Sequence, residues 1–112
     1  MSTLAEKRCV PCEGGTPALS DAEARQLLDQ VKGWQLSQPE GKSTRIEKSF
    51  PFKGFMPGLD FVNKVARVAE DEDHHPDLLL RWGEVRVTLW THAARGLTEN
   101  DFILAAKIDQ LT

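Results

Sequence analysis

The stretch that decides the fold class is Leu78-Leu79-Leu80-Arg81-Trp82-Gly83-Glu84-Val85-Arg86-Val87-Thr88-Leu89-Trp90-Thr91. Two runs of strand-forming residues are joined tightly at Gly83, which is typical of a β-hairpin. In the second run the side chains alternate between two faces, and one face carries Val85, Val87, Leu89 and Thr91. The stretch therefore predicts two antiparallel strands, residues 78–82 and 84–91.

A second pair of strands is expected upstream of this hairpin. Residues 34–36 predict a short strand, and Pro39 and Gly41 predict a turn after it. Residues 43–50 alternate in the way that a half-buried strand does, with Ile46 and Phe50 on the same face. The chain therefore contains two predicted hairpins.

Two capping signals mark the first and the last helix. Ser20 followed by Glu23 is a capping box, so a helix is expected to begin there and to end at Gly33. Thr98 followed by Asp101 resembles a capping box and predicts the start of the last helix. The apolar residues of this last helix are Phe102, Ala105, Ala106 and Ile108.

A longer helix is expected between the hairpins, from Phe55 to near Asp73. Its apolar residues recur at helical spacing and predict one buried stripe of Phe55, Leu59, Val62, Ala66 and Ala69. Pro57 fits only within the first turn of such a helix. Pro76 disfavours helical geometry at His75, which is therefore expected to be extended or in a turn.

These elements follow one another in the order αββαββα. Two hairpins separated by a helix favour an α+β fold, with a four-stranded antiparallel sheet and helices on one face. Residues 19–112 are therefore expected to form a single domain. Residues 1–18 are rich in glycine, proline and small polar residues, which predicts a loose N-terminal leader.

The composition of this 112-residue chain argues against several classes of function. Hydrophobic residues make up 40% and charged residues 28%, as in ordinary globular proteins. A net charge of −3 argues against a nucleic-acid partner, and no apolar run approaches the ~20 residues of a membrane helix. Residues 1–12 lack the apolar segment of a secretory signal. We therefore expect a cytoplasmic protein without a nucleic-acid or membrane partner.

The two cysteines, Cys9 and Cys12, lie in the predicted leader. A redox Cys-x-x-Cys pair normally follows a strand, and no strand is predicted before this one. A structural zinc site takes four ligands, and the sequence holds no second pair of this kind. The favoured interpretation is an exposed turn, while a zinc ion shared with another chain or a reversible disulfide stays open.

Residues 70–77, Glu-Asp-Glu-Asp-His-His-Pro-Asp, hold two of the chain's three histidines among five carboxylates. A metal site, an acid–base site and a solvated acidic helix end all use these residue types. Adjacent side chains in an extended segment point to opposite sides, so His74 and His75 are not expected to bind one ion together. No pair of histidines at chelating spacing strengthens the metal interpretation, and we assign no metal-binding residue.

Acid–base chemistry fits these residues better than metal binding. Histidine exchanges protons near neutral pH, and a nearby carboxylate stabilises its charged ring. Glu70 lies one helical turn before His74 if the helix persists that far, Asp73 adjoins the two histidines, and His92 follows a predicted strand. On spacing alone a solvated helix end stays open, and Asp101 has a structural explanation as part of a capping box.

The spacing of these residues resembles the signature of the pterin-4a-carbinolamine dehydratase family. The matching positions are Glu70, His74, His75, Pro76, Trp82, His92 and Asp101. Gly33-Trp34 after the first helix adds to the match, and the element order over residues 19–110 is similar to that of the family.

The resemblance implies dehydration of 4a-hydroxytetrahydrobiopterin, or a similar tetrahydropterin, to the quinonoid dihydropterin by metal-free histidine catalysis. The pterin is the substrate, so no cofactor is implied. The active-site histidines fall on His74, His75 and His92, and we expect His75 and His92 to transfer the protons. Positions that contact the pterin fall on Pro76, Thr91, Ala93 and Ala94, and supporting positions fall on Glu70, Asp73 and Asp101.

The resemblance also implies partners. The reaction recycles the pterin of aromatic amino acid hydroxylases, so such a hydroxylase is a possible partner, and family members assemble as homodimers or homotetramers. The alternative function is a non-catalytic binding or assembly partner on the same fold, either as the dimerisation cofactor of a transcription factor or as an assembly factor for a carboxylating enzyme. The three histidines favour the enzyme.

Overall fold

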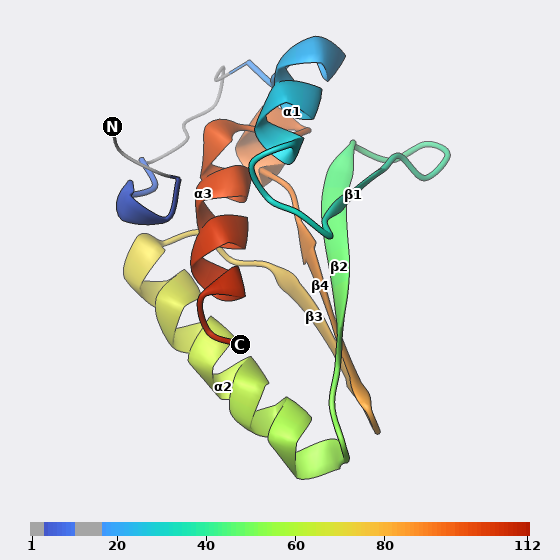
Figure 1. Ribbon diagram of the computed structural model, residues 1–112. Helices are drawn as coiled ribbons and strands as arrows, with labels where there is room; N and C mark the ends of the chain where they lie inside the picture. The colour runs from blue at the N-terminus through green and yellow to red at the C-terminus, as the bar shows by residue number, and fades with distance from the viewer. Residues whose placement is uncertain (1–3, 11–16) are drawn as a thin grey trace.

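A four-stranded antiparallel sheet forms the centre of the fold (Figure 1). The computed structural model describes residues 4–10 and 17–112. The strands are β1 (Gln35–Ser37), β2 (Arg45–Pro51), β3 (Asp77–Arg81) and β4 (Glu84–Leu89). They lie in the order β1-β2-β4-β3, so the two predicted hairpins meet at β2 and β4 in the middle of the sheet. The predicted α+β fold and its antiparallel sheet are confirmed.

Within the described residues, three α-helices cover one face of this sheet: α1 (Asp21–Leu28), α2 (Phe55–Glu72) and α3 (Glu99–Asp109) (Figure 1). Two short 3-10 helices, η1 (Leu4–Glu6) and η2 (His92–Ala94), precede α1 and α3. The helix α2 packs on β3 and β4 and against α3, while η1 packs on α3. The order αββαββα is confirmed, and it leaves the end of α2 close to the start of α3.

The sheet buries the residues that were predicted to share a face. Ile46 lies opposite Leu89 and Phe50 lies opposite Val85 in the β2–β4 pairing, and all four side chains are buried. The strand ends differ from prediction by one or two residues. In particular, β4 ends at Leu89 because Thr91 pairs with Gly96 across the following turn.

Trp82 lies in the hairpin turn rather than in a strand. It is 75% exposed, although residue 82 was predicted to be the last residue of the strand 78–82, and β3 ends at Arg81. It belongs to the end of the molecule where α2 begins, because the Gly83 N–H donates to the Gly54 carbonyl at 3.3 Å.

The rotation of α2 also differs from prediction. The residues that it buries are Gly58, Phe61, Val65, Ala69 and Glu72, so only Ala69 of the predicted stripe lies on the buried line. A Cβ at position 58 would lie 3.0 Å from Leu80 Cδ1, and the missing side chain lets the helix approach the hairpin closely. Helical spacing alone predicted the helix, and Pro57 in its first turn, but not the face that it buries.

The first helix is shorter than predicted. The capping box of Ser20 and Glu23 is present, but α1 ends at Leu28 rather than at Gly33. Turns follow, in which Val31 is buried and Gly33 takes a positive φ of 88°. Gly33 therefore closes the turns that follow α1 rather than the helix itself.

The described part of the predicted loose leader is packed against the domain. Leu4 is 5% exposed and belongs to the core, and η1 lies beside α3 (Figure 1). Cys9 is half-buried rather than exposed, while Cys12 lies outside the described residues. Among the helices that the structure describes, none is long and apolar enough to cross a membrane.

Candidate active site

The C-terminal end of α2 presents the two adjacent histidines. The His74 N–H donates to the Ala69 carbonyl at 3.1 Å, and the Asp73 N–H donates to the Glu70 carbonyl at 3.2 Å, the two hydrogen bonds of a Schellman motif. Asp73 takes the left-handed conformation that this motif needs, with φ 51° and ψ 40°. The chain therefore leaves the helix before His74, and His75 is non-helical as Pro76 predicts.

His74 is held by the buried carboxylate of Asp101, which lies 27 residues further along the chain. Its Nε2 lies 2.6 Å from Oδ1 of Asp101 at the start of α3, and the two side chains are 11% and 0% exposed. The other carboxylate oxygen, Oδ2, accepts the Thr98 N–H at 3.0 Å and the Thr91 hydroxyl at 2.8 Å. Asp101 thus ties α2, α3 and the end of β4 together.

The hydrogen bonds of this network assign the protons. A carboxylate only accepts, so Thr91 gives its hydroxyl proton to Asp101 and receives the Thr98 hydroxyl proton at 2.8 Å. By the same reasoning Nε2 of His74 is the donor toward the Asp101 carboxylate. Nδ1 is consequently the nitrogen of His74 that is left for exchange with a ligand.

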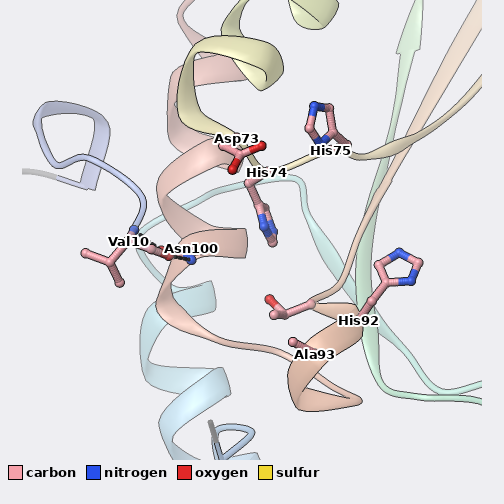
Figure 2. A pocket seen from close by; sticks show the side chains of 8 residues that line it. Val10, Asp73, His74, His75, His92, Ala93 and Asn100 are labelled. Atoms are coloured by element: carbon pink, nitrogen blue, oxygen red, sulfur yellow. Dashed lines mark hydrogen bonds between the residues drawn. The ribbon is translucent and has the colours of Figure 1, made fainter. Parts of the chain in front are cut away.

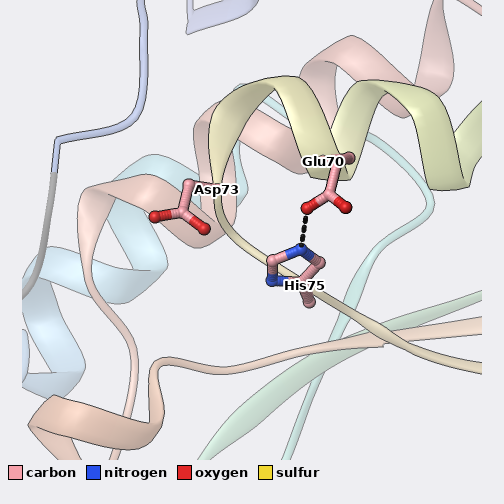
Figure 3. Close-up of side chains that lie close together, drawn as sticks. All are labelled: Glu70, Asp73 and His75. Atoms are coloured by element: carbon pink, nitrogen blue, oxygen red, sulfur yellow. Dashed lines mark hydrogen bonds and ion pairs between the residues drawn. The ribbon is translucent and has the colours of Figure 1, made fainter.

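His75 has a different, exposed partner. Its Nε2 lies 3.0 Å from Oε1 of Glu70, and the two side chains are 57% and 77% exposed (Figure 3). The sequence placed Glu70 one turn before His74 only if the helix persisted that far. The helix ends at Asp73, so this i, i+4 pair does not form, and Glu70 contacts His75 instead.

Asp73 lies near Glu70 and the His75 ring (Figure 3). Ligand atoms of Glu70, Asp73 and His75 lie within 4.8 Å of one another, and all three residues are exposed. Exposed carboxylates gather in this way on ordinary protein surfaces, and the one hydrogen bond within the group serves to hold His75.

His92 is placed by stacking rather than by a carboxylate. Its ring centroid lies 4.1 Å from that of Trp90, with the ring planes at 36°. The guanidinium of Arg45 lies 4.6 Å from the centre of the Trp90 ring, a distance typical of a cation–π contact. The stacking on Trp90 restrains the plane of the His92 imidazole.

All three histidines line one pocket of about 260 Å³, close to the ~300 Å³ lower end of small-molecule sites. His74 extends into its middle from the end of α2, and His92 comes from the opposite side (Figure 2). Among the residues that the structure describes, the lining is Val10, Asp73, His74, His75, Thr91, His92, Ala93 and Asn100.

The predicted site residues fall into two groups. The histidines, Asp73, Thr91 and Ala93 line the pocket, while Glu70 and Asp101 lie behind His75 and His74. Pro76 and Ala94 are not among the lining residues. The predicted contact of these two residues with the pterin is untested.

Two lining residues, Val10 and Asn100, were not predicted from the sequence. Asn100 follows Glu99 in the capping segment of α3 and is 4% exposed, and an asparagine beside a capping acid was the only signal. Val10 carried no signal, because nothing in the leader predicts that it folds back onto the domain.

Comparison with known proteins identifies the family of this site. The family model described as pterin 4 alpha carbinolamine dehydratase matches residues 17–111. The chain belongs to this family. The matched region contains the three histidines and Asp101, while Val10 precedes it.

Relatives match beyond the family model and include nearly the whole chain. A Rubrobacter xylanophilus protein, provisionally named a pterin-4-alpha-carbinolamine dehydratase, is 46% identical over 99% of this chain and 100% of its own length. Pterin-4-alpha-carbinolamine dehydratase 2, mitochondrial, of Arabidopsis thaliana is also 46% identical, over 99% of this chain and 60% of its own length.

Solved structures of two similar proteins bear different descriptions. The transcriptional coactivator/pterin dehydratase of Brucella melitensis is 35% identical with a TM-score of 0.75, over 84% of this chain and 97% of its own. A pterin dehydratase-like protein described as a RuBisCO assembly factor in the alpha-carboxysome is 26% identical with a TM-score of 0.58, over 70% of this chain and 88% of its own.

Proposed function

We propose that the pocket dehydrates a pterin-4a-carbinolamine, with the proton transfers divided among its three histidines. The family carries this activity, which makes the chain a hydro-lyase, a 4a-hydroxytetrahydrobiopterin dehydratase. The observation that supports the division of roles is that His74, His75 and His92 line one pocket while each ring is held by a different neighbour.

The reaction needs one proton given and one proton taken. The C4a hydroxyl leaves as water once it receives a proton, the bond from C4a to oxygen breaks, and N5 loses its proton as a double bond forms between C4a and N5. The product is the quinonoid dihydropterin, and no electron acceptor or donor is required. Two positioned imidazoles suffice for both transfers.

His75 is the proposed general acid. Its ring is hydrogen-bonded to the Glu70 carboxylate at 3.0 Å, and this contact orients the imidazole so that it can give a proton to the hydroxyl. The ring is also exposed enough to exchange with water between turnovers. Protonated His75 therefore supplies the proton with which the hydroxyl departs.

His92 is the proposed general base. It lines the pocket across from His74 and has Trp90, rather than a carboxylate, as its neighbour in the described structure. A stacked neutral imidazole can accept the N5 proton at a ring nitrogen and return it to solvent. Trp90 keeps this ring at a constant angle during the exchange.

His74 is the proposed anchor of the pterin. Asp101 occupies its Nε2, so Nδ1 serves the substrate, either by bonding the ring system or by sharing the acid role. Thr91 and Ala93 line the same pocket and complete the contact surface. Because Asp101 bonds three donors, this histidine is the fixed point from which the substrate is positioned.

The test of the function is the rate at which the purified chain removes a 4a-carbinolamine formed by an aromatic amino acid hydroxylase. We expect the loss of carbinolamine absorbance to be faster than the spontaneous dehydration and to be unchanged by a chelator. A rate equal to the spontaneous one would contradict the dehydratase function. A rate abolished by the chelator would contradict the histidine mechanism.

Assembly and compartment belong to the same proposal. Large hydrophobic side chains stay exposed where α2 begins and along the hairpin, namely Phe55, Met56, Leu79 and Trp82, and such exposure supports a homodimer or homotetramer. We infer a cytoplasmic protein that serves an aromatic amino acid hydroxylase. The complete set of histidines in the pocket favours this role over that of an assembly factor.

A further inference from the structure

Trp90 and Trp34 differ in what fixes their indole rings. Trp34 donates its Nε1–H to both carboxylate oxygens of Asp109, at 3.1 Å each. Nε1 of Trp90 is buried and has no hydrogen-bond partner among the residues that the structure describes, although a buried indole N–H usually finds an acceptor. The orientation of Trp90 therefore depends on contacts with its ring rather than on a hydrogen bond.

Packing leaves one side of Trp90 open. The residue lines a second pocket, of about 400 Å³, together with Arg45 at the start of β2 and Asp77 at the start of β3. Where a side chain borders open space, it has no neighbouring atoms to restrain it. The contacts that Trp90 does make with charged and aromatic neighbours are therefore the ones that hold its ring.

Arg45 supplies one of these contacts. Its Cζ lies 4.6 Å from the centre of the Trp90 ring, within the range of a cation–π contact. Arg45 precedes Ile46 and Trp90 follows Leu89, and these two residues oppose each other at the end of the β2–β4 pairing. The guanidinium is itself restrained, because its Nε donates to the Ser43 carbonyl at 3.2 Å. Arg45 thus presents a fixed cation to the indole.

His92 makes the other ring contact, and it belongs to the active-site pocket. Its ring centroid lies 4.1 Å from that of Trp90, and His92 is exposed to solvent. No described carboxylate orients this imidazole, in contrast to those of His74 and His75. A displacement of the indole would therefore displace the imidazole that stacks on it.

We propose that Arg45 is a positioning residue for His92 and that it acts through Trp90. The inference rests on the proposed function of the pocket, in which His92 takes the N5 proton. The guanidinium restrains the indole, and the indole restrains the imidazole at the angle from which it reaches the substrate. Catalysis depends steeply on such geometry, so loss of the Arg45 contact slows the chemical step and leaves the binding of the pterin by His74 unchanged.

The decisive variant is Arg45→Met, which keeps a long side chain and removes the charge. We expect kcat to fall about fivefold, with KM changed by less than about twofold. Arg45→Lys keeps a cation beside the ring and should lose less than Arg45→Met. The matched control is Arg86→Met, the same substitution four residues before Trp90. Arg86 contacts Ser49 at 3.4 Å and Glu84 at 3.6 Å, and its replacement should leave both constants unchanged.

A second readout needs no turnover. The ring current of a stacked indole moves the carbon-bound imidazole protons of His92 upfield in the NMR spectrum, and this shift should shrink in Arg45→Met and persist in Arg86→Met. If the shift behaves in this way while the wild-type chain dehydrates no carbinolamine, the proposed function fails and the positioning contact stands. An unchanged shift in Arg45→Met, or a smaller shift with wild-type kcat, would overturn the proposal.

Discussion

Two histidine–carboxylate pairs lie at the C-terminal end of α2, one buried and one exposed to solvent. His74 and Asp101 are 11% and 0% exposed and lie 2.6 Å apart, whereas His75 and Glu70 are 57% and 77% exposed and lie 3.0 Å apart. The first pair spans 27 residues of sequence and the second only five. Both histidines follow Asp73, the left-handed residue at which α2 ends.

The difference in burial predicts a difference in role. A buried carboxylate with three donors is costly to disturb, because any donor left behind loses both its partner and access to water. An exposed ion pair is screened by solvent and contributes little to stability. We therefore expect the His74 pair to hold the architecture of the site and the His75 pair to carry chemistry.

The largest predicted effect on stability follows from breaking the buried pair. Asp101→Ala removes the acceptor of His74, Thr91 and Thr98 and should lower the free energy of unfolding by about 3–5 kcal/mol. Urea denaturation measures this loss. Asp101→Asn keeps the shape and should fall between Ala and wild type, which keeps the test usable if the Ala variant does not fold.

Breaking the exposed pair of Glu70 and His75 should cost little stability but much of the activity. Glu70→Ala should change the free energy of unfolding by less than ~1 kcal/mol. It should lower kcat by about ten- to a hundredfold, the ~1.5–3 kcal/mol that a hydrogen bond to a charged group contributes. Denaturation and steady-state kinetics on the same preparation test both halves. Equal losses of stability in Glu70→Ala and Asp101→Ala would remove the distinction between the two pairs.

The smallest predicted effect concerns a third contact at this helix end, between Glu72 and Cys9. Burial, and next the charges of Glu72 and Asp101, raise the pKa of the Cys9 thiol from 9.0 to about 12. The folded state therefore favours the protonated thiol, so its contribution to stability is complete below pH 9.0 and is lost as the pH rises toward about 12.

Cys9→Ala is the matched variant for this effect. In a Cys12→Ser background, stability should fall more steeply above pH 9.0 with Cys9 present than after Cys9→Ala. Urea denaturation over this pH range compares the two slopes. Identical slopes would show that the thiol ionises as freely in the folded chain as in the unfolded one.

Much of the fold follows from local sequence signals. Alternation in residues 43–50 and 84–91, capping residues at Ser20 and Thr98, and Gly83 between two strands act within a few residues. The corresponding elements formed, with shifted ends. The rotation of α2 did not follow, because it depends on how closely Gly58 approaches Leu80, a contact between elements that are distant in sequence.

The sequence predicted the histidines of the candidate site better than it predicted their carboxylate partners. The three predicted histidines line one pocket. The conditional pair of Glu70 and His74 did not form, because the helix ends at Asp73, and a left-handed residue other than glycine is rare enough that the sequence gave no clear sign of it. Val10 was missed because its place depends on two hydrogen bonds from Asn100, 90 residues away in the sequence.

The most direct test of the account is the dehydration rate of His75→Ala and of His92→Ala at the same folded fraction as wild type. Each variant should lose about 10²–10⁴-fold in kcat/KM, the usual contribution of general acid–base catalysis. Each should unfold within about 0.5 kcal/mol of wild type, because both side chains are exposed. Wild-type rates in both variants would contradict the assignment of the proton transfers to these two histidines.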